Sequence, residues 1–248
     1  AQQVSMAGDW GAASEALREL RTNLRFVSVD DPARCIVVTS SNQGEGKSTI
    51  AAHLSSALAE SGQPTVLIDA DLRRPVQASH FSVEGQVGLT QLLAGTVRLD
   101  DALAPTSIEN LRLLPAGKIP PNPSELLGSG RMQTLLKQLR EDYLVIIDAP
   151  PLLPVTDAAL LTVASDGAIL VAHQGKTRIE QLALAARKLQ HVEGNLLGTV
   201  LNMVPKSDLG DATFGYGYGS YISEDYYQSD EQNEKPPRRD TKKPQRAR

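Results

Sequence analysis

The chain has 248 residues, of which 41% are hydrophobic and 22% charged, an ordinary composition for a globular protein of one or two domains. A single cysteine excludes a disulfide framework and a cysteine-based zinc site. No stretch approaches the roughly 18 consecutive apolar residues of a membrane-spanning helix, and no signal peptide is indicated. The formal charge of −4 argues against nucleic acid as a partner.

Apolar, β-branched runs alternate with helical patterns along most of the chain. An amphipathic helix is predicted over residues 14–26, before the first strand. The predicted strands cover residues 35–38, 65–68, 144–147, 168–171 and 199–201. The predicted helices between them cover residues 50–60, 129–140, 158–163 and 180–191. The strands are continuous apolar runs, which is typical of parallel sheets covered on both faces. We therefore expect an α/β fold with a doubly wound, mostly parallel sheet and helices on both faces.

The composition changes after about residue 205. Residues 208–227 are rich in Gly, Tyr, Ser and Asp, and residues 228–248 contain almost nothing that a core would bury. Residues 235–248 carry seven Lys or Arg and one Asp. We expect this basic end to be solvated, although anionic lipid head groups would also suit it. The sequence thus predicts one compact domain over residues 1–206 and a flexible tail over residues 207–248.

A phosphate-binding loop is predicted for the sequence SNQGEGKS at residues 41–48, because it follows a strand and precedes a helix. Its glycines let backbone N–H groups turn inward around phosphates, and the helix that follows adds its positive dipole. Lys47 would reach the β- and γ-phosphates, and the Ser48 hydroxyl would coordinate Mg²⁺. Ser41 replaces the usual first glycine, so a glycine-rich turn that binds nothing is the alternative. The expected nucleotide-binding residues of the loop are Gln43, Gly44, Glu45, Gly46, Lys47, Ser48 and Thr49.

Two further motifs end predicted strands with carboxylates. The segment VLIDADLR contains Asp69, Asp71 and Arg73, and the segment VIIDAPP contains Asp148. Ligands of open parallel sheets bind beyond the carboxyl ends of the strands, so these carboxylates are expected to converge beside the phosphate-binding loop. Each Asp alone could cap a turn. Because Mg²⁺ prefers oxygen ligands, the motifs together predict a site for ATP and Mg²⁺.

These three motifs resemble those of the bacterial tyrosine kinases, the BY-kinase family, over about residues 10–227. In that family, a P-loop opening with Ala or Ser is followed by three apolar residues and Asp-x-Asp-x-Arg. The third motif has three apolar residues, Asp, a small residue and Pro-Pro; the small residue is commonly Ser or Thr and is Ala149 here. The Asp-x-Asp-x-Arg element is the most discriminating, because generic P-loop proteins lack it.

MinD- and ParA-like ATPases share the P-loop NTPase fold and are the alternative family. They carry an extra lysine five residues before the P-loop lysine, where this chain has Asn42. This difference favours the kinase over an ATPase switch that recruits partners without phosphorylating protein. In related P-loop proteins, the residue matching Asn202 reads the adenine, although an asparagine here could also simply cap the strand end.

The resemblance implies roles for the site residues. Lys47, which we expect at a solvated mouth, would neutralise charge on the transferred phosphate. Ser48 and Asp148 would hold Mg²⁺, with assistance from Asp71. Asp69 is the candidate to accept the tyrosine proton, and Asp71 is the alternative. The candidate catalytic residues are therefore Lys47, Asp69, Asp71 and Arg73.

Five of the six tyrosines lie in a single stretch of twelve residues, 216–227, inside the predicted tail. A flexible tail can present a hydroxyl to an active site, whereas Tyr143 directly precedes an apolar strand and is expected to be at least partly buried. BY-kinases end in such a cluster and autophosphorylate it; the alternative is a merely sticky low-complexity segment. The expected acceptors are Tyr216, Tyr218, Tyr221, Tyr226 and Tyr227.

Glu15, Arg18 and Arg21 are spaced along one side of the predicted N-terminal helix. Alone, they would form a solvated face with an ion pair between positions i and i+3. They also match the motif by which BY-kinases assemble into rings. The resemblance thus implies a homo-oligomer in the unphosphorylated state, within which the tail of one copy is phosphorylated by another.

The family implies a protein-tyrosine kinase that regulates the synthesis and export of surface polysaccharide at the cytoplasmic face of the bacterial membrane. Its implied partners are further copies of the chain, a transmembrane activator in the same or a separate chain, and a tyrosine phosphatase. No nucleic acid is expected.

Overall fold

A computed structural model describes residues 11–26 and 32–205, and all the elements below lie in one compact unit, Ala1–Met203. Residues 206–248 lie outside the described residues, and with them the predicted tail, its five tyrosines and its basic end. The predicted domain boundary stays a prediction. Within the part of the chain that the structure describes, no helix combines the length and apolarity needed to cross a membrane.

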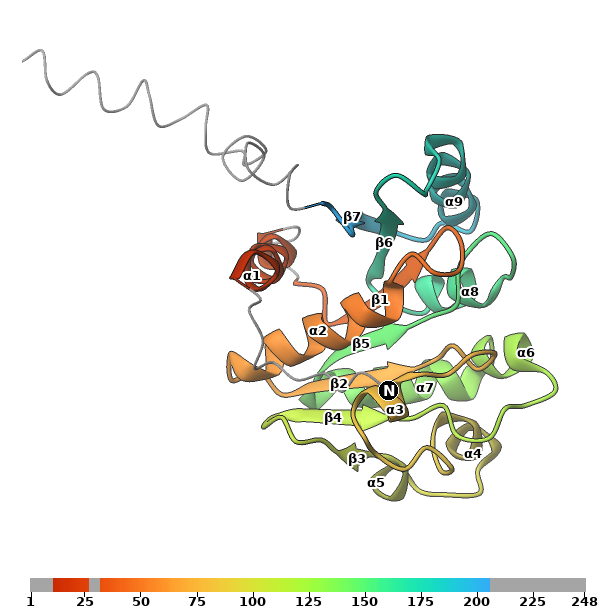
Figure 1. Cartoon of the computed structure of the whole chain (residues 1–248). Coiled ribbons are helices and arrows are strands. Elements are labelled where there is room, and N and C mark those ends of the chain that lie inside the picture. Colours follow the sequence, from red (N-terminus) through yellow and green to blue (C-terminus); the bar gives the residue numbers. More distant parts are fainter. Residues whose placement is uncertain (1–10, 27–31, 206–248) are drawn as a thin grey trace, which may run out of the picture. The chain divides into compact units, whose positions relative to one another are not determined.

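A seven-stranded sheet forms the centre of this unit (Figure 1). The strand order is β3-β4-β2-β5-β1-β6-β7, and all neighbouring pairs are parallel except β3 and β4. The strands are β1 (Cys35–Ser40), β2 (Thr65–Asp69), β3 (Ala104–Pro105), β4 (Leu111–Leu114), β5 (Leu144–Asp148), β6 (Gly167–His173) and β7 (Leu196–Asn202). The predicted strands correspond to β1, β2, β5, β6 and β7, so the doubly wound, mostly parallel sheet is confirmed.

Helices connect the strands and cover both faces of the sheet. Those that the sequence predicted are α1 (Gly11–Phe26), α2 (Lys47–Glu60), α7 (Gly130–Asp142), α8 (Asp157–Val163) and α9 (Ile179–His191). Four shorter helices were not predicted: α3 (Gln77–His80), α4 (Leu89–Ala94), α5 (Leu99–Ala102) and α6 (Pro123–Leu127).

The edge of the sheet formed by β4 and β3 was also missing from the prediction. β4 has four residues and β3 has two, one of which is a proline. The exposed Arg112 interrupts the apolar run of β4, and the two residues of β3 form no run at all, so neither segment shows the continuous apolar pattern of the predicted strands. The sheet therefore extends one parallel strand beyond β2, and the antiparallel β3 closes it.

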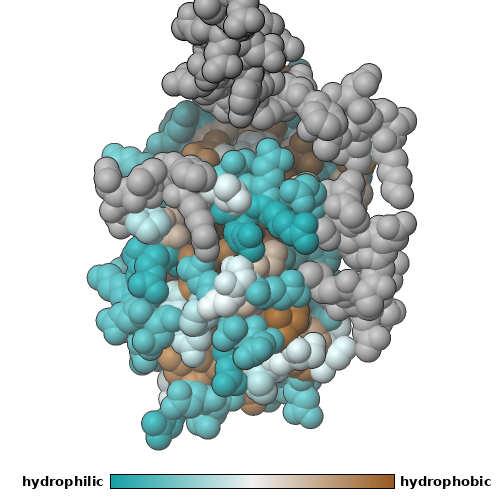
Figure 2. Space-filling view, turned by 90° about the vertical axis from the view of Figure 1, so that its left-hand side faces the viewer, coloured by the Kyte–Doolittle hydropathy of each residue, from teal (hydrophilic) through white to brown (hydrophobic). Residues whose placement is uncertain are grey.

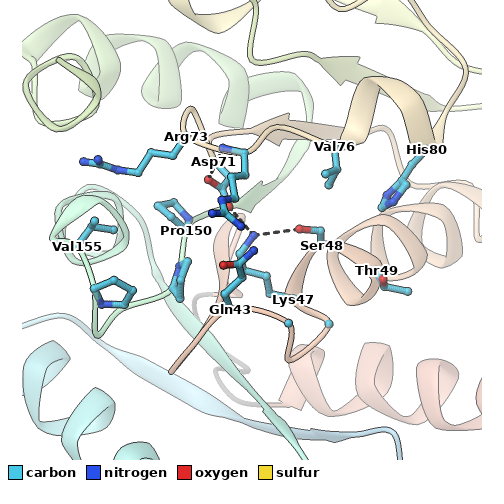
Figure 3. A pocket seen from close by; sticks show the side chains of 15 residues that line it. Gln43, Lys47, Ser48, Thr49, Asp71, Arg73, Val76, His80, Pro150 and Val155 are labelled. Carbon is cyan, nitrogen blue, oxygen red and sulfur yellow. Dashed lines mark hydrogen bonds and ion pairs between the residues drawn. The ribbon is translucent and has the colours of Figure 1, made fainter. Parts of the chain in front are cut away.

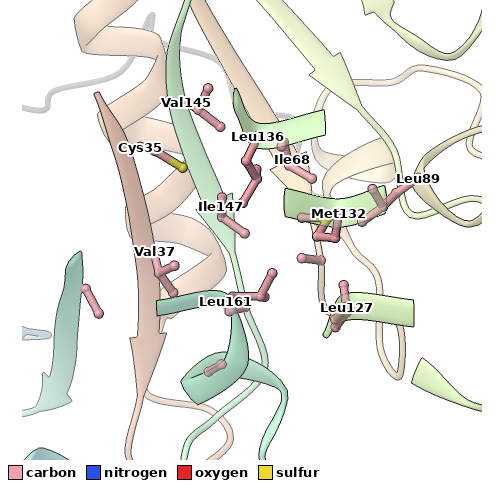
Figure 4. Packing of buried hydrophobic residues seen from close by; sticks show 14 of the residues in the cluster. Cys35, Val37, Ile68, Leu89, Leu127, Met132, Leu136, Val145, Ile147 and Leu161 are labelled. Atoms are coloured by element: carbon pink, nitrogen blue, oxygen red, sulfur yellow. The ribbon is translucent and has the colours of Figure 1, made fainter. Parts of the chain in front are cut away.

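Side chains of the central strands alternate between two hydrophobic cores, one on each face. Cys35 and Val37 belong to the core covered by α7, α8 and α9, which Figure 4 shows, and Ile36 and Val38 belong to the core covered by α2. Burial on both faces explains why the strand sequences are continuously apolar. On the face shown in Figure 2, the described residues are mostly hydrophilic, and hydrophobic ones appear in separate patches.

The strand register brings the carboxyl ends of three central strands together. Asp69, the last residue of β2, pairs with Asp148, the last residue of β5. On its other side Asp148 pairs with Val38 of β1, which continues through Ser40 into the loop before α2. The acidic strand ends and the predicted phosphate-binding loop therefore meet at one edge of the sheet.

Candidate active site

The loop between β1 and α2 has the backbone that a phosphate-binding loop requires. Gly44 and Gly46 have φ angles of 80° and 92°, in the left-handed region that favours glycine. A Cβ atom on Gly46 would lie 2.0 Å from Nδ2 of Asn202, so this position also lacks room for a side chain. α2 begins directly afterwards at Lys47, and its first backbone N–H groups and positive dipole suit an anion.

The ammonium group of Lys47 lies at the centre of a buried charge cluster. Nζ donates hydrogen bonds to Asp71 Oδ2 at 2.8 Å and to Ser48 Oγ at 3.0 Å (Figure 3). It also donates to Asp148 Oδ1 at 3.3 Å. Lys47 is only 8% exposed, so the expectation of a solvated lysine is wrong. The two carboxylates behind the loop attract the side chain inward.

Burial and charge act in opposite directions on this cluster. Burial tends to lower the pKa of Lys47, but the carboxylates of Asp148 and Asp71 raise that pKa above its ordinary value. Burial raises the pKa of Asp148, and the Lys47 ammonium and the Gln77 amide offset part of the rise. The arrangement keeps Lys47 protonated beside the loop.

Asp69 and Asp71 have different surroundings despite their closeness in the motif. Asp69 is fully buried, and its Oδ2 accepts hydrogen bonds from the backbone N–H groups of Val76 and Gln77 at 3.0 and 2.9 Å. Burial, followed by the charge of Asp148, raises the pKa of Asp69 to about 8. Asp71 lines the cavity beside the loop, and Asp69 does not. The geometry thus favours Asp71 as the carboxylate that a substrate can reach.

Gln77 is a site residue that the sequence did not reveal. Its Nε2 donates hydrogen bonds to Asp148 Oδ2 at 2.7 Å and to the Ser48 carbonyl oxygen at 3.0 Å, and the residue is fully buried. Gln77 thereby joins the start of α3 to β5 and α2. No motif marks it, because its position depends on how the segment after β2 folds back toward the loop.

A cavity of about 510 Å³ opens beside the loop, a size that suits a small-molecule ligand. Figure 3 shows Arg73, Pro150 and Val155 on one side of it and Thr49 and His80 on the other. The predicted site residues that line it are Gln43, Gly44, Gly46, Lys47, Ser48, Thr49, Asp71 and Arg73. The predicted site residues outside the lining are Glu45, Asp69, Asp148 and Asn202.

Arg73 is held at the cavity by an ion pair. Its Nε donates to Asp157 Oδ2 at 2.9 Å, and its Nη2 donates to Asp157 Oδ1 at 3.3 Å. Asp157, the fully buried first residue of α8, also accepts a hydrogen bond from the Ser124 hydroxyl at 2.6 Å. The sequence did not reveal Asp157, since 84 positions separate it from Arg73.

Hydrogen bonds of Glu45 and Asn202 hold the phosphate-binding loop in place. Glu45 is 2% exposed; its Oε2 accepts from the Asn42 N–H at 2.9 Å, and its Oε1 accepts from the Thr177 hydroxyl at 2.6 Å. Asn202 Nδ2 donates to the Glu45 carbonyl oxygen at 3.1 Å. The exposed Lys176 also approaches the loop, because its Nζ lies 3.3 Å from the place that a Cβ atom on Gly44 would occupy.

On α1, Glu15 and Arg18 are exposed, whereas Arg21 is half-buried. Arg18 Nη1 donates to Glu15 Oε2 at 2.9 Å, the i and i+3 ion pair that the spacing predicts. Arg21 Nη1 donates to the carbonyl oxygen of Ala57 on α2 at 3.4 Å. Tyr143 is partly buried against a hydrophobic core, as predicted.

The donor set beside Lys47 fits Mg²⁺. The described residues contain no group of three or more His, Cys, Asp or Glu side chains that could hold a metal by themselves. Magnesium is usually held by one or two carboxylates together with substrate phosphates rather than by an all-protein cage. Asp71, Asp148 and the Ser48 hydroxyl offer such a partial set of oxygens.

Comparison with known proteins first defines the class. A family model described as an AAA domain matches residues 33–196. The solved structure of the cell division ATPase MinD of Pyrococcus furiosus is similar, with a TM-score of 0.59 and 26% identity, over 73% of this chain and 79% of that chain. With the loop geometry above, these similarities define a P-loop nucleotide-binding domain.

Three further similarities define the family. The tyrosine-protein kinase YwqD of Bacillus subtilis (strain 168) is 42% identical over 200 residues, which cover 80% of this chain and 84% of that protein. The tyrosine-protein kinase CpsD of Streptococcus agalactiae is 36% identical over 214 residues, covering 85% and 90%. The solved kinase domain of the Escherichia coli tyrosine kinase ETK has a TM-score of 0.78 and 34% identity, over 88% of this chain and 86% of that chain. The chain therefore belongs to the bacterial tyrosine-protein kinases and is a protein-tyrosine kinase.

Proposed function

We propose that the chain transfers the γ-phosphoryl group of ATP to tyrosines of residues 216–227 in a neighbouring copy of itself. The observation that supports this most directly is the cluster of Lys47, Ser48, Asp71 and Asp148 beside the 510 Å³ cavity. It combines a cation for the phosphates, oxygens for a metal and a carboxylate for a proton.

The roles follow from what phosphoryl transfer requires, which is mainly positioning and charge stabilisation. The tyrosine oxygen bonds to the γ-phosphorus while the bond from that phosphorus to the β,γ-bridging oxygen breaks, and ADP leaves with the electron pair. Asp71 accepts the tyrosine proton, because it lines the cavity. Asp69 holds the segment after β2 through its bonds to two backbone N–H groups. Lys47 offsets the charge that develops on the phosphate oxygens.

Mg²⁺ would be held by Ser48, Asp71 and Asp148, and when bound it would neutralise charge on the β- and γ-phosphates. Lys47 bonds to the same three oxygens. The long lysine stem allows the ammonium group to turn toward the phosphates when a nucleotide enters. Gln77 keeps Asp148 in place throughout that exchange, since it bonds the other carboxylate oxygen.

The wider role is proposed from the family resemblance. The chain would regulate surface polysaccharide synthesis and export at the cytoplasmic face of the membrane, with a transmembrane activator and an opposing tyrosine phosphatase. The relatives are compatible with both arrangements of the activator, because the matched region covers only 28% of the E. coli tyrosine-protein kinase etk but 84% and 90% of YwqD and CpsD. Rings of unphosphorylated copies, joined through Glu15, Arg18 and Arg21, would bring each tail to a neighbouring site.

The decisive experiment incubates the purified chain, made in a host without other tyrosine kinases, with Mg²⁺ and γ-labelled ATP. Label on the tyrosines of residues 216–227 is expected. Replacing all five by Phe should remove nearly all label while ATP binding is retained. Release of free phosphate without labelled protein would instead favour an ATPase switch, and a main phosphosite at Tyr143 would contradict the assignment of the acceptors.

A further inference from the structure

Arg73 and Arg74 are adjacent in sequence, but within the described part of the chain only the side chain of Arg73 is paired with a carboxylate. The Arg73 guanidinium is paired with the buried carboxylate of Asp157. The Arg74 side chain also lines the cavity, is exposed, and makes no hydrogen bond or ion pair within residues 11–26 and 32–205. Arg74 is therefore a free cation at the mouth of the site.

The backbone of Arg74 is fixed beside the proposed proton acceptor. Its N–H donates to both the Asp71 carboxylate Oδ1 and the Asp71 carbonyl oxygen, each at 3.1 Å. The side chain thus starts from an anchored point next to the carboxylate that a tyrosine hydroxyl must approach. A guanidinium offers several donors in a planar fork, which matches carboxylates in a bidentate geometry.

The other cations near the cavity are already engaged or lie elsewhere. Lys47 bonds to two carboxylates and Arg73 to one. Lys176 lies against the phosphate-binding loop and is not part of the cavity lining. Arg74 is thus the lining cation best suited to a group of the protein substrate.

The proposed acceptor tyrosines fall into two classes by their flanking sequence. Tyr226 and Tyr227 follow directly after Glu224 and Asp225 in the segment SEDYYQSDE. The other three have no acidic residue within two positions on either side, since they lie in the segment FGYGYGSYI. The chain therefore contains acidic and neutral acceptor sites side by side.

We propose that Arg74 determines substrate specificity by binding the carboxylates that immediately precede an acceptor tyrosine, so that Tyr226 and Tyr227 are phosphorylated first. This inference rests on the proposed tyrosine autophosphorylation. An extended chain advances about 3.3–3.6 Å per residue, which keeps carboxylates one or two positions before the tyrosine close to it. That spacing suits an arginine whose backbone is bonded to Asp71. External substrates of this kinase would accordingly carry acidic residues just before the tyrosine.

The test follows initial phosphorylation rates at each tyrosine of the full chain, with Mg²⁺ and ATP at low salt. Arg74→Gln should slow Tyr226 and Tyr227 about fivefold, the upper range for an exposed ion pair, and should slow the other three less than twofold. Raising the salt should reduce the preference of the unmodified chain, because exposed charges are screened. Arg98→Gln is the matched control, since Arg98 is 85% exposed and outside the cavity lining.

A change in the substrate provides a second, independent arm. Replacing Glu224 and Asp225 by Gln and Asn should slow Tyr226 and Tyr227 to the same extent. Adding Arg74→Gln to that variant should then have little further effect, as expected for two groups that act through one contact. Arg74→Glu combined with Lys at positions 224 and 225 should restore part of the preference.

Three outcomes would contradict the inference. Equal slowing at all five tyrosines together with a raised KM for ATP would assign Arg74 to the nucleotide. An unchanged ratio between the two classes in Arg74→Gln, or in the tail variant, would overturn the inference and leave the kinase function intact. A complete lack of phosphotyrosine in the unmodified chain would instead overturn the proposed autophosphorylation and the inference with it.

Discussion

Two groups of charged side chains in this molecule differ mainly in their burial. The side chains of Lys47, Asp71 and Asp148 are 10%, 7% and 0% exposed, whereas those of Arg18 and Glu15 on α1 are 64% and 67% exposed. Both groups contain short ion pairs of about the same length. Solvent therefore distinguishes them more than geometry does.

Burial changes what each group can contribute. Exposed ion pairs usually add only about 0–1 kcal/mol to stability, because water and salt screen them. Removing one partner of a buried pair costs several times more, since the remaining charge is left without compensation. The cost of the buried cluster at Lys47 is consistent with its proposed role in the site, and the charges on α1 become important only where another surface covers them.

The largest effect is expected for Lys47→Met, which keeps the side-chain length and removes the charge. Phosphotyrosine formation should fall at least about 100-fold, as when a group that stabilises transition-state charge is removed. The free energy of unfolding should also fall, by about 3–5 kcal/mol, because the buried carboxylates of Asp71 and Asp148 lose their cation. Site-resolved phosphorylation and urea unfolding measure the two effects. Unchanged phosphotyrosine would contradict the role of Lys47, and an unchanged unfolding energy would contradict the buried cluster.

Gln77→Leu should have the next largest effect. It removes the hydrogen bonds from Nε2 to Asp148 and to the Ser48 carbonyl oxygen but preserves most of the buried volume. We expect a loss of about 1–3 kcal/mol in unfolding free energy, and roughly tenfold slower phosphorylation with little change in the KM for ATP. Gln133→Leu on the exposed side of α7 is the control. Full activity in Gln77→Leu would show that Asp148 needs no support from this amide.

The difference between what the sequence predicted and what it missed has a physical cause. The loop before α2 and the carboxylates at residues 69, 71 and 148 could be predicted, because each lies in a continuous motif at a strand end. Parallel strands then bring these ends together without further information. That Asp71 lines the cavity and Asp69 does not could be seen only in the structure, since it depends on how the segment after β2 folds.

Contacts between distant segments could not be predicted from one sequence. Thr177 and Glu45 are 132 positions apart, and neither residue type is unusual for its location. The solvated position expected for Lys47 was wrong for the same reason, because its burial depends on carboxylates contributed by two other strands. β4 and β3 were missed because Arg112 interrupts the apolar run of β4 and β3 has only two residues, one of them a proline.

Thr177→Val should have a moderate effect, because it removes the hydroxyl that bonds to Glu45 and keeps the side-chain shape. The Glu45 carboxylate accepts hydrogen bonds from the Asn42 N–H and the Thr177 hydroxyl, and of these two bonds only the one from Asn42 remains in this variant. We expect the KM for ATP to rise about threefold and the maximal phosphorylation rate to change less. Thr134→Val at an exposed position of α7 provides a comparison. An equal KM for ATP in both variants would contradict the inference that the hydrogen bond from Thr177 to Glu45 holds the phosphate-binding loop in place.

Phosphorylation of the five tyrosines should determine whether the exposed charges of α1 are covered by a neighbouring copy. Each phosphotyrosine adds about −1.5 to −2 charges at neutral pH, so five would add roughly −8 to −10 to each copy. Repulsion between copies should then favour the monomer over the proposed ring. Light scattering on phosphorylated and phosphatase-treated chains, at equal concentration and low salt with Mg²⁺, measures the difference. The same mass for both forms would reject this switch.

The smallest effect on the isolated chain is expected for Arg18→Ala. The lost ion pair to Glu15 is exposed to water, so the unfolding free energy should change by less than about 0.5 kcal/mol. Assembly should respond differently, because a neighbour that covers Arg18 would remove it from water and make its hydrogen bonds stronger. Urea unfolding at low protein concentration and light scattering at high concentration separate the two responses. Loss of the assembled form with unchanged unfolding would show that α1 acts between copies, whereas intact assembly would leave Glu15 and Arg18 as an ordinary solvated pair.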